Sequence, residues 1–131
     1  MIKVVIDTNV LISSNLSNNG SPAKIMKLYY LKELQIFYSQ EILDEYIRVL
    51  AYRRFDFSIS IQTAVVDAIL KGGICIDPPV SSFFMPDETD RSFYDTTIAS
   101  GSILITGNKK DFPKESFIVT PSEFLFNYIS N

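Results

Sequence analysis

The chain has 131 residues, of which 47% are hydrophobic, 13% aromatic and 21% charged, a size and composition typical of one globular domain. It contains no histidine and one cysteine, which excludes catalysis through histidine, zinc sites built from histidine or thiolates, and internal disulfides. Twelve basic and fifteen acidic residues give a net charge of −3, which argues against broad, non-specific binding of nucleic acid.

The apolar segments of the chain are short. They fall far below the roughly 20 residues that a membrane-spanning helix needs, and the first residues lead into a strand without the cleavage pattern of a signal peptide. We therefore expect a cytoplasmic protein without a membrane segment.

The first predicted element is a run of β-branched residues that ends at Asp7 and is typical of a buried strand in a parallel sheet. Such a strand places Asp7 at its carboxyl end, where ligands bind in open parallel sheets. An aspartate there can hold a divalent cation, act as a base or accept a phosphoryl group. Alternatively, Asp7 caps the turn and helix that follow, and the sequence weighs the two roles about equally.

The next elements alternate between helix and strand. The pattern predicts a polar loop over 14–20, a helix from Ser21 to about Glu33, a short strand over 35–39 and a strongly amphipathic helix over 39–54. On this last helix, Glu45 lies at the border of the apolar face. It either points into the crevice beside the sheet or is exposed and paired with Arg48, and helical geometry alone favours the exposed position.

Two adjacent arginines, Arg53 and Arg54, end the amphipathic helix beside Phe55. Arginine binds phosphate oxygens through two hydrogen bonds, which makes this pair the best candidate for contact with a phosphate backbone. Cations at the carboxyl end of a helix are also ordinary partners of the helix dipole, which is the more common role.

The remaining elements continue the alternation. The pattern predicts a helix over 58–71, a strand over 74–76 with Cys75 as a small core residue, a proline-rich linker over 77–85, a helix over 86–100, strands over 102–106 and 117–120, and a helix over 121–129. Buried strands that alternate with helices predict a three-layer α/β/α sandwich with a mostly parallel sheet of about five strands. No repeat or linker divides the chain, so we expect a single domain over residues 1–131.

Two acids lie on the predicted helix over 86–100. Asp90 falls in the middle of the inward face of this helix, where an acid is costly unless the helix start is open to water or a cation lies beside it. Asp95 lies about 60° outside that face by the helical spacing, so an exposed position is as plausible for it as a role in a site.

The strand over 102–106 delivers a second group of polar residues to the same edge of the sheet. Thr106 ends this strand, Gly107 permits a close approach of the backbone, and Asn108 offers a neutral oxygen ligand. A plain turn is the alternative.

Together these segments bring a set of possible ligands to one side of the sheet, namely Asp7, Glu45, Asp90, Asn108 and, as a residue on the flank of its helix, Asp95. Hard oxygen donors without histidine or cysteine suit Mg²⁺ or Mn²⁺, and the natural substrate of such a site is a phosphodiester.

Four segments together resemble the PIN-domain ribonucleases, and within them the VapC-like toxins of toxin–antitoxin systems. They are IDTNVLIS at 6–13, SQEILDEYIRVL at 39–50, DETDRSFYDTTIASG at 87–101 and LITGNKKDFP at 104–113. Their order and spacing carry the resemblance, which covers nearly the whole chain and implies a PIN-like fold.

The resemblance implies Mg²⁺- or Mn²⁺-dependent endonucleolytic cleavage of RNA, a homodimer, and a cognate antitoxin protein that fills the active groove. It implies that Asp7, Glu45 and Asp90 are the catalytic acids, with Asp95 as a near neighbour that aligns with acidic positions in relatives. Many relatives carry aspartate at the position of Asn108.

The resemblance also implies that Thr106 orients the acids and that Asn9 holds the first loop. Arg53 and Arg54 become candidates for contact with RNA, and Asp111 could compensate for the amide at position 108.

Two other functions compete with the ribonuclease. A catalytically silent PIN-like module that binds RNA or protein is favoured by Asn108. A phosphotransferase or receiver built on Asp7 is disfavoured, because the chain has no glycine-rich phosphate cradle and Asn9 replaces the second aspartate of a DxD element.

Overall fold

The computed structural model describes residues 1–82 and 84–129, and its centre is a five-stranded sheet. The strands are β1 (Ile2–Ile6), β2 (Leu34–Tyr38), β3 (Ile74–Cys75), β4 (Ile103–Ile105) and β5 (Ile118–Val119). They follow the order β3-β2-β1-β4-β5, and every neighbouring pair is parallel. Because β1 lies between β2 and β4, the strand order reverses at β1, and the crevice beside its carboxyl end is where such sheets bind ligands.

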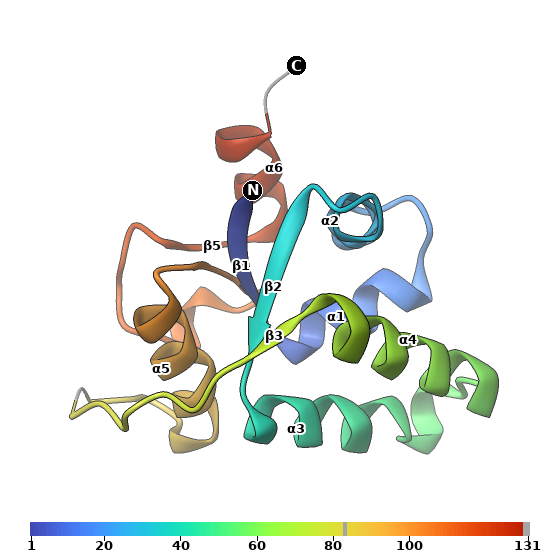
Figure 1. Ribbon diagram of the computed structural model, residues 1–131, viewed down its shortest axis with the longest axis horizontal. Helices are drawn as coiled ribbons and strands as arrows, with labels where there is room; N and C mark the ends of the chain where they lie inside the picture. Colours follow the sequence, from blue (N-terminus) through green and yellow to red (C-terminus); the bar gives the residue numbers. More distant parts are fainter. Residues whose placement is uncertain (83, 130–131) are drawn as a thin grey trace.

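Helices cover both faces of the sheet. They are α1 (Thr8–Leu16), α2 (Ser21–Tyr30), α3 (Gln40–Leu50), α4 (Ile59–Gly72), α5 (Arg91–Ser100) and α6 (Pro121–Tyr128), with short 3₁₀ turns η1 (Arg53–Phe55), η2 (Glu88–Asp90) and η3 (Lys109–Asp111). Helix α5 packs on one face against β1, β2 and β4, whereas α1, α2 and α4 lie on the other (Figure 1). Helix α3 crosses beneath the carboxyl ends of the strands. The predicted three-layer α/β/α sandwich is therefore confirmed.

The core forms where the sheet is covered on both faces. Val4, Val5 and Ile6 of β1 and Ile36 of β2 are fully buried, as expected for central strands of a parallel sheet. Tyr46 and Phe93 join them from α3 and α5, with ring centroids 6.4 Å apart. None of the helices in the described part of the chain is long and apolar enough to span a membrane.

Several predictions about local structure are wrong. The helix expected over 86–100 begins only at Arg91, because Asp87 caps the separate 3₁₀ turn η2 before it. The loop expected over 14–20 begins later, because α1 follows β1 directly and continues to Leu16. The helix expected over 39–54 ends at Leu50, and η1 begins a new turn at Arg53. Cys75 is exposed rather than buried, because β3 is the edge strand of the sheet.

Candidate functional site

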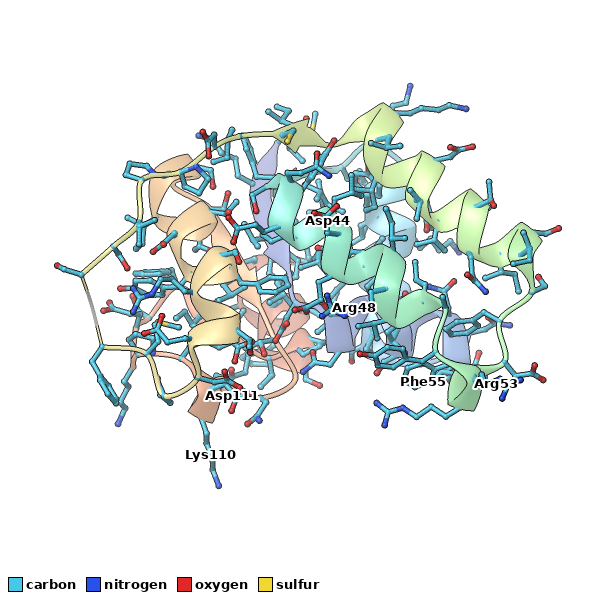
Figure 2. All side chains as sticks on the ribbon, turned by 90° about the horizontal axis from the view of Figure 1, so that it is seen from below. Asp44, Arg48, Arg53, Phe55, Lys110 and Asp111 are labelled. Carbon is cyan, nitrogen blue, oxygen red and sulfur yellow. The ribbon has the colours of Figure 1, made fainter. Side chains whose placement is uncertain are left out.

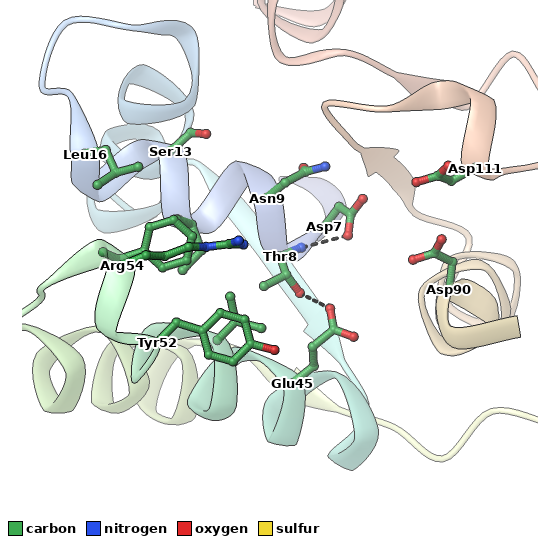
Figure 3. Close-up of a pocket in the computed structure, with 13 residues that line it drawn as sticks. Asp7, Thr8, Asn9, Ser13, Leu16, Glu45, Tyr52, Arg54, Asp90 and Asp111 are labelled. Atoms are coloured by element: carbon green, nitrogen blue, oxygen red, sulfur yellow. Dashed lines mark hydrogen bonds between the residues drawn. The ribbon is translucent and has the colours of Figure 1, made fainter. Parts of the chain in front are cut away.

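Four carboxylates line one cleft at the carboxyl edge of the sheet. They belong to Asp7, Glu45, Asp90 and Asp111, and the cleft has a volume of about 410 Å³ (Figure 3). Each acid comes from a different segment: the end of β1, the middle of α3, the end of η2 and the end of η3. The parallel order of the strands brings these segments together, as expected for a sheet whose strand order reverses at β1.

Asp7 is held by a hydrogen bond at each carboxylate oxygen. Oδ1 accepts from the backbone N–H of Thr8 at 2.8 Å, and Oδ2 accepts from the hydroxyl of Thr106 at 2.7 Å. Asp7 therefore caps α1 and lines the cleft at the same time, so both roles considered from the sequence apply.

Burial dominates the ionisation of Asp7. It raises the pKa of this carboxyl from 3.8 to about 6, against the two hydrogen bonds, which lower the pKa, and with a smaller contribution from the charges of Glu45 and Asp111. A carboxyl group with this pKa takes up a proton more readily than a free aspartate but is still mostly ionised at pH 7, and a cation beside it would favour the charged form further.

Glu45 reaches the cleft from α3. One carboxylate oxygen accepts a hydrogen bond from the hydroxyl of Thr8, and the other lies 3.8 Å from a guanidinium nitrogen of Arg48. The exposed ion pair and the position in the crevice were alternatives in the sequence, and the structure combines them.

Tyr46, the residue after Glu45, positions α3 relative to the sheet. Tyr46 is fully buried, and its hydroxyl donates a hydrogen bond to the carbonyl of Ile6, the residue before Asp7. Burial, followed by the charges of Asp7 and Glu45, raises the pKa of Tyr46 well above its ordinary value, so this hydroxyl keeps its proton and remains a donor. The contact positions the helix that carries Glu45 against the strand that carries Asp7.

Asp90 lies half-buried at the start of α5, where η2 ends. The pKa of Asp90 is raised from 3.8 to about 7. Burial is the largest cause, followed by the charges of Asp7 and Asp111 and then those of Asp87 and Glu45. The acids thus oppose one another's ionisation, which is the electrostatic signature of carboxylates gathered without a compensating charge.

The loop after β4 carries the fourth acid and two supporting contacts. The backbone N–H of Asn108 donates to the hydroxyl of Thr106 at 3.0 Å, and the N–H of Gly107 donates to the side chain of Asn9 at 3.1 Å. The bond to Asn9 ties the loop to the beginning of α1, and Thr106 links the loop to Asp7 through its own hydroxyl.

Asn108 itself does not line the cleft. Its amide donates to the carboxylate of Asp111 at 2.9 Å, so that Asp111 rather than Asn108 presents oxygen atoms to the site. The sequence offered Asp111 only as a possible substitute. A helical turn brings residues three apart to the same side, and the spacing of Asn108 and Asp111 in GNKKD was the signal for this contact.

Asp95 also lies outside the cleft. It is 5% exposed, and Oδ2 accepts a hydrogen bond from the backbone N–H of Ser81 at 3.2 Å. The exposed position considered for it is therefore wrong, and its contact holds the segment before η2 against α5.

The other end of the cleft is aromatic and basic. Tyr52, Arg54 and Phe55 line it, and in Figure 3 the guanidinium of Arg54 extends towards Thr8. Arg53 does not line the cleft and lies at the outer edge of the molecule (Figure 2). The sequence could not separate the two arginines, and it gave no role to Tyr52, although the spacing of Tyr52 and Phe55 is that of one 3₁₀ turn.

The donor set has the chemistry of a site for a hard divalent cation. Within residues 1–82 and 84–129, however, no three acidic side chains converge closely enough to hold one ion. The acids surround the cleft instead of converging on one point. The raised pKa values of Asp7 and Asp90 show that a positive charge would be favourable there.

The sequence and the fold of the chain are similar to those of known proteins. The chain is 32% identical over 111 residues to an uncharacterised protein of Methanocaldococcus jannaschii, a match that covers 82% of this chain and 72% of the relative. Its fold resembles the crystal structure of VapBC2 from Rickettsia felis bound to a DNA fragment from their promoter, with a TM-score of 0.60 and 16% identity over 91% of this chain and 97% of that one. The sequence model of the PIN domain matches residues 3–110, which include Asp7, Glu45 and Asp90. The chain therefore belongs to the PIN domain family.

Proposed function

We propose that this protein is a Mg²⁺- or Mn²⁺-dependent endoribonuclease and the toxin of a toxin–antitoxin pair. The observation that carries the proposal is the gathering of Asp7, Glu45, Asp90 and Asp111 around one cleft at the carboxyl edge of the sheet. Membership of the PIN domain family supports hydrolysis of a phosphodiester, and the proposal takes residues 1–131 as one such domain in the cytoplasm.

The four acids would hold the cation. Carboxylate oxygens are the ligands that Mg²⁺ and Mn²⁺ prefer. A bound divalent cation supplies a Lewis acid, which lowers the pKa of a water molecule and offsets the charge that builds on a scissile phosphate. Asn108 orients Asp111 in this proposal, and Asp95 stabilises the segment beside the site rather than acting in it.

The contacts of the chain fix the positions from which the acids act. Thr106 and Thr8 each donate a hydroxyl hydrogen bond to an acid, to Asp7 and Glu45 respectively. Tyr46 holds α3 against β1. These neutral donors orient the carboxylates without cancelling their charge, so the negative charge remains available to a cation.

A catalytically silent binding module is the second candidate. It is favoured by the same observation that limits the first, namely that no three acids among the described residues converge on one point. In that case the cleft would bind RNA or a protein segment through its basic and aromatic end.

Calorimetry with Mn²⁺ at neutral pH decides between the two. We expect saturable binding to the wild type that weakens at least tenfold in Asp7→Asn, a loss of about 1.4 kcal/mol or more. Asp67→Asn is the matched control, because Asp67 is an exposed acid on α4 outside the cleft. Absence of binding to the wild type at millimolar Mn²⁺ would contradict the ribonuclease and favour the silent module.

A cleavage screen on mixed RNA in Mn²⁺ follows if the ion binds, with the same two variants. Partners are proposed from the family resemblance and from the fold, which is shared with the VapBC2 complex. We propose a homodimer, visible by light scattering as twice the mass of one chain. We also propose a cognate antitoxin, whose co-expression would relieve a growth arrest that the wild type causes and Asp7→Asn does not.

A further inference from the structure

The basic and aromatic end of the cleft has a defined geometry of its own. Tyr52, Arg54 and Phe55 form it, and we call these three residues the aromatic wall. The rings of Tyr52 and Phe55 are almost parallel, with an interplanar angle of 8° and centroids 6.3 Å apart. The guanidinium carbon of Arg54 lies 4.9 Å from the centroid of Phe55 and 5.6 Å from that of Tyr52.

The aromatic wall has one ring that packs against the core and another that is exposed to solvent. Phe55 is half-buried against the core, and Phe57 stacks on it with centroids 5.9 Å apart. Tyr52 is 39% exposed, and Arg54 is exposed. Phe57 and the guanidinium of Arg54 both pack on Phe55, so Tyr52 is the ring of this cluster that is exposed to solvent.

Charge distinguishes the aromatic wall from the rest of the cleft. Arg54 is the one basic side chain among the described residues that line the cleft, and the four acids lie towards its other end (Figure 3). A ligand that spans the cleft must therefore offer a planar, apolar group and an anion at this end. A nucleotide offers both, because its base stacks on aromatic rings and its phosphate pairs with arginine.

We infer that the aromatic wall binds an unpaired nucleotide of single-stranded RNA, with the base stacked on the exposed ring of Tyr52 and a phosphate beside the scissile one contacting Arg54. The inference rests on the proposed function, because it places the scissile phosphate at the acids. A volume of about 410 Å³ lies in the range of sites that enclose a ligand the size of one nucleotide.

The same geometry selects against a duplex. Bases inside a duplex have both faces covered by their neighbours, so they cannot present a face to an aromatic side chain, whereas unpaired bases can. The net charge of −3 also gives the chain no general attraction for a duplex backbone. Selectivity for unpaired segments thus arises from the site rather than from a basic surface.

The test measures binding in the presence of a chelator, so that no strand is cleaved whatever the acids do. A short labelled single-stranded RNA is titrated with the protein at low salt and followed by fluorescence anisotropy. The comparison ligands are the same RNA in a duplex and a strand of equal length whose nucleotides lack bases. Tyr52→Leu removes the ring and keeps an apolar side chain, Tyr52→Phe keeps the ring, and Tyr30→Leu is a matched control on α2 outside the cleft.

We expect Tyr52→Leu to weaken binding of the single-stranded RNA about tenfold and to leave binding of the abasic strand unchanged. Tyr52→Phe and Tyr30→Leu should bind as the wild type does. Arg54→Gln should weaken both strands and reduce the slope of log K against log salt by about 0.7, because one phosphate contact is lost.

Three results would overturn the inference. They are wild-type affinity of Tyr52→Leu for the single strand, an equal loss of affinity for the abasic strand, or a duplex that binds as tightly as the single strand. Wild-type affinity of Tyr52→Leu for RNA would leave the aromatic wall to a protein segment such as that of an antitoxin. Mn²⁺ calorimetry on Tyr52→Leu separates this test from that of the proposed function, since the acids are intact and metal binding should be unchanged.

Discussion

Asp7 combines two roles in the same two oxygen atoms. One oxygen caps α1, and the other accepts from Thr106, so the carboxylate cannot turn freely. Both bonds lower the pKa of Asp7, yet burial outweighs them and leaves it at about 6. The residue is thus fixed in orientation before any ligand arrives, and its charge remains only partly compensated.

Thr106→Val tests this balance. Thr106 is fully buried, and loss of its hydroxyl removes a donor from Asp7 and an acceptor from the N–H of Asn108. We expect the pKa of Asp7 to rise further and the free energy of unfolding to fall by about 1–3 kcal/mol. Carboxyl NMR titration and urea unfolding measure the two effects. Thr106→Ser, which keeps the hydroxyl, should restore both, and an unchanged pKa in Thr106→Val would contradict the argument.

The sequence predicts the positions of some acids better than others. Asp7 follows from the strand pattern, because a strand end defines a direction. Asp90 is predicted on the inward face of a helix, but α5 begins only at Arg91 and Asp90 reaches the cleft from the end of η2. Asp111 does not follow from such a pattern, because η3 is a single turn whose orientation depends on the contacts of its loop. Asp95 lies within α5, and its contact with Ser81, which the helical pattern does not reveal, directs it away from the cleft.

The junction between α4 and β3 depends on close backbone contacts. Helix α4 ends at Gly72 and β3 begins at Ile74, so Gly73 is the single residue that connects the two elements. The N–H of Gly73 donates to the carbonyl of Ile69 at 2.8 Å. A Cβ atom at Gly73 would lie 2.6 Å from that carbonyl oxygen and 2.8 Å from the ring of Tyr38.

Gly73→Ala should therefore displace the end of α4 from β2. We expect the free energy of unfolding to fall by about 1–3 kcal/mol, as for other overpacked sites, measured by urea unfolding. Gly20→Ser is the contrasting variant, since a Cβ there meets only Pro22 at 3.5 Å and serine caps helices well. It should be neutral or stabilising, and equal losses in both variants would show that steric overlap is not the cause.

Helix α1 shows why some elements escape prediction. Its apolar residues Val10–Ile12 are consecutive and buried, so they give no helical period that could separate a helix from a buried strand or loop. The cap at Asp7 specifies the helix instead. The longer helices α3 and α4 have period and caps in agreement, with Ser39 and Ser58 as N-caps. The bounds of α4 and the start of α3 are therefore predicted closely, whereas α3 ends four residues before the predicted end.

On the scale of the whole molecule, the gathered acids make stability depend on pH. In the folded protein the pKa is about 6 for Asp7 and about 7 for Asp90, against 3.8 for each in the unfolded chain. Between these values the folded state binds more protons than the unfolded state. Stability from these groups is therefore greatest at low pH and is lost as the pH rises from about 4 to about 7.

In a chelator, the midpoint of thermal unfolding should be lower at about pH 8 than at about pH 5. Asp90→Asn should reduce this difference and unfold at a higher temperature than the wild type at the higher pH, whereas Asp67→Asn should retain the wild-type difference. Mn²⁺ should raise the midpoint most at the higher pH, where it does not compete with protons. A midpoint that rises steadily with pH in the chelator would contradict this account.

The 3₁₀ turn η1 belongs to a different part of the fold from the elements that carry the acids. The acids lie at the end of β1, in the middle of α3 and at the ends of η2 and η3, whereas Tyr52, Arg54 and Phe55 lie at a short surface turn that is followed by Asp56 with φ of 53°. Surface turns accept substitutions that a packed sheet does not. Residues 52–57 can therefore change without disturbing the sheet edge, and under the proposed function separate parts of the chain determine the recognition of a target and the chemistry at the acids.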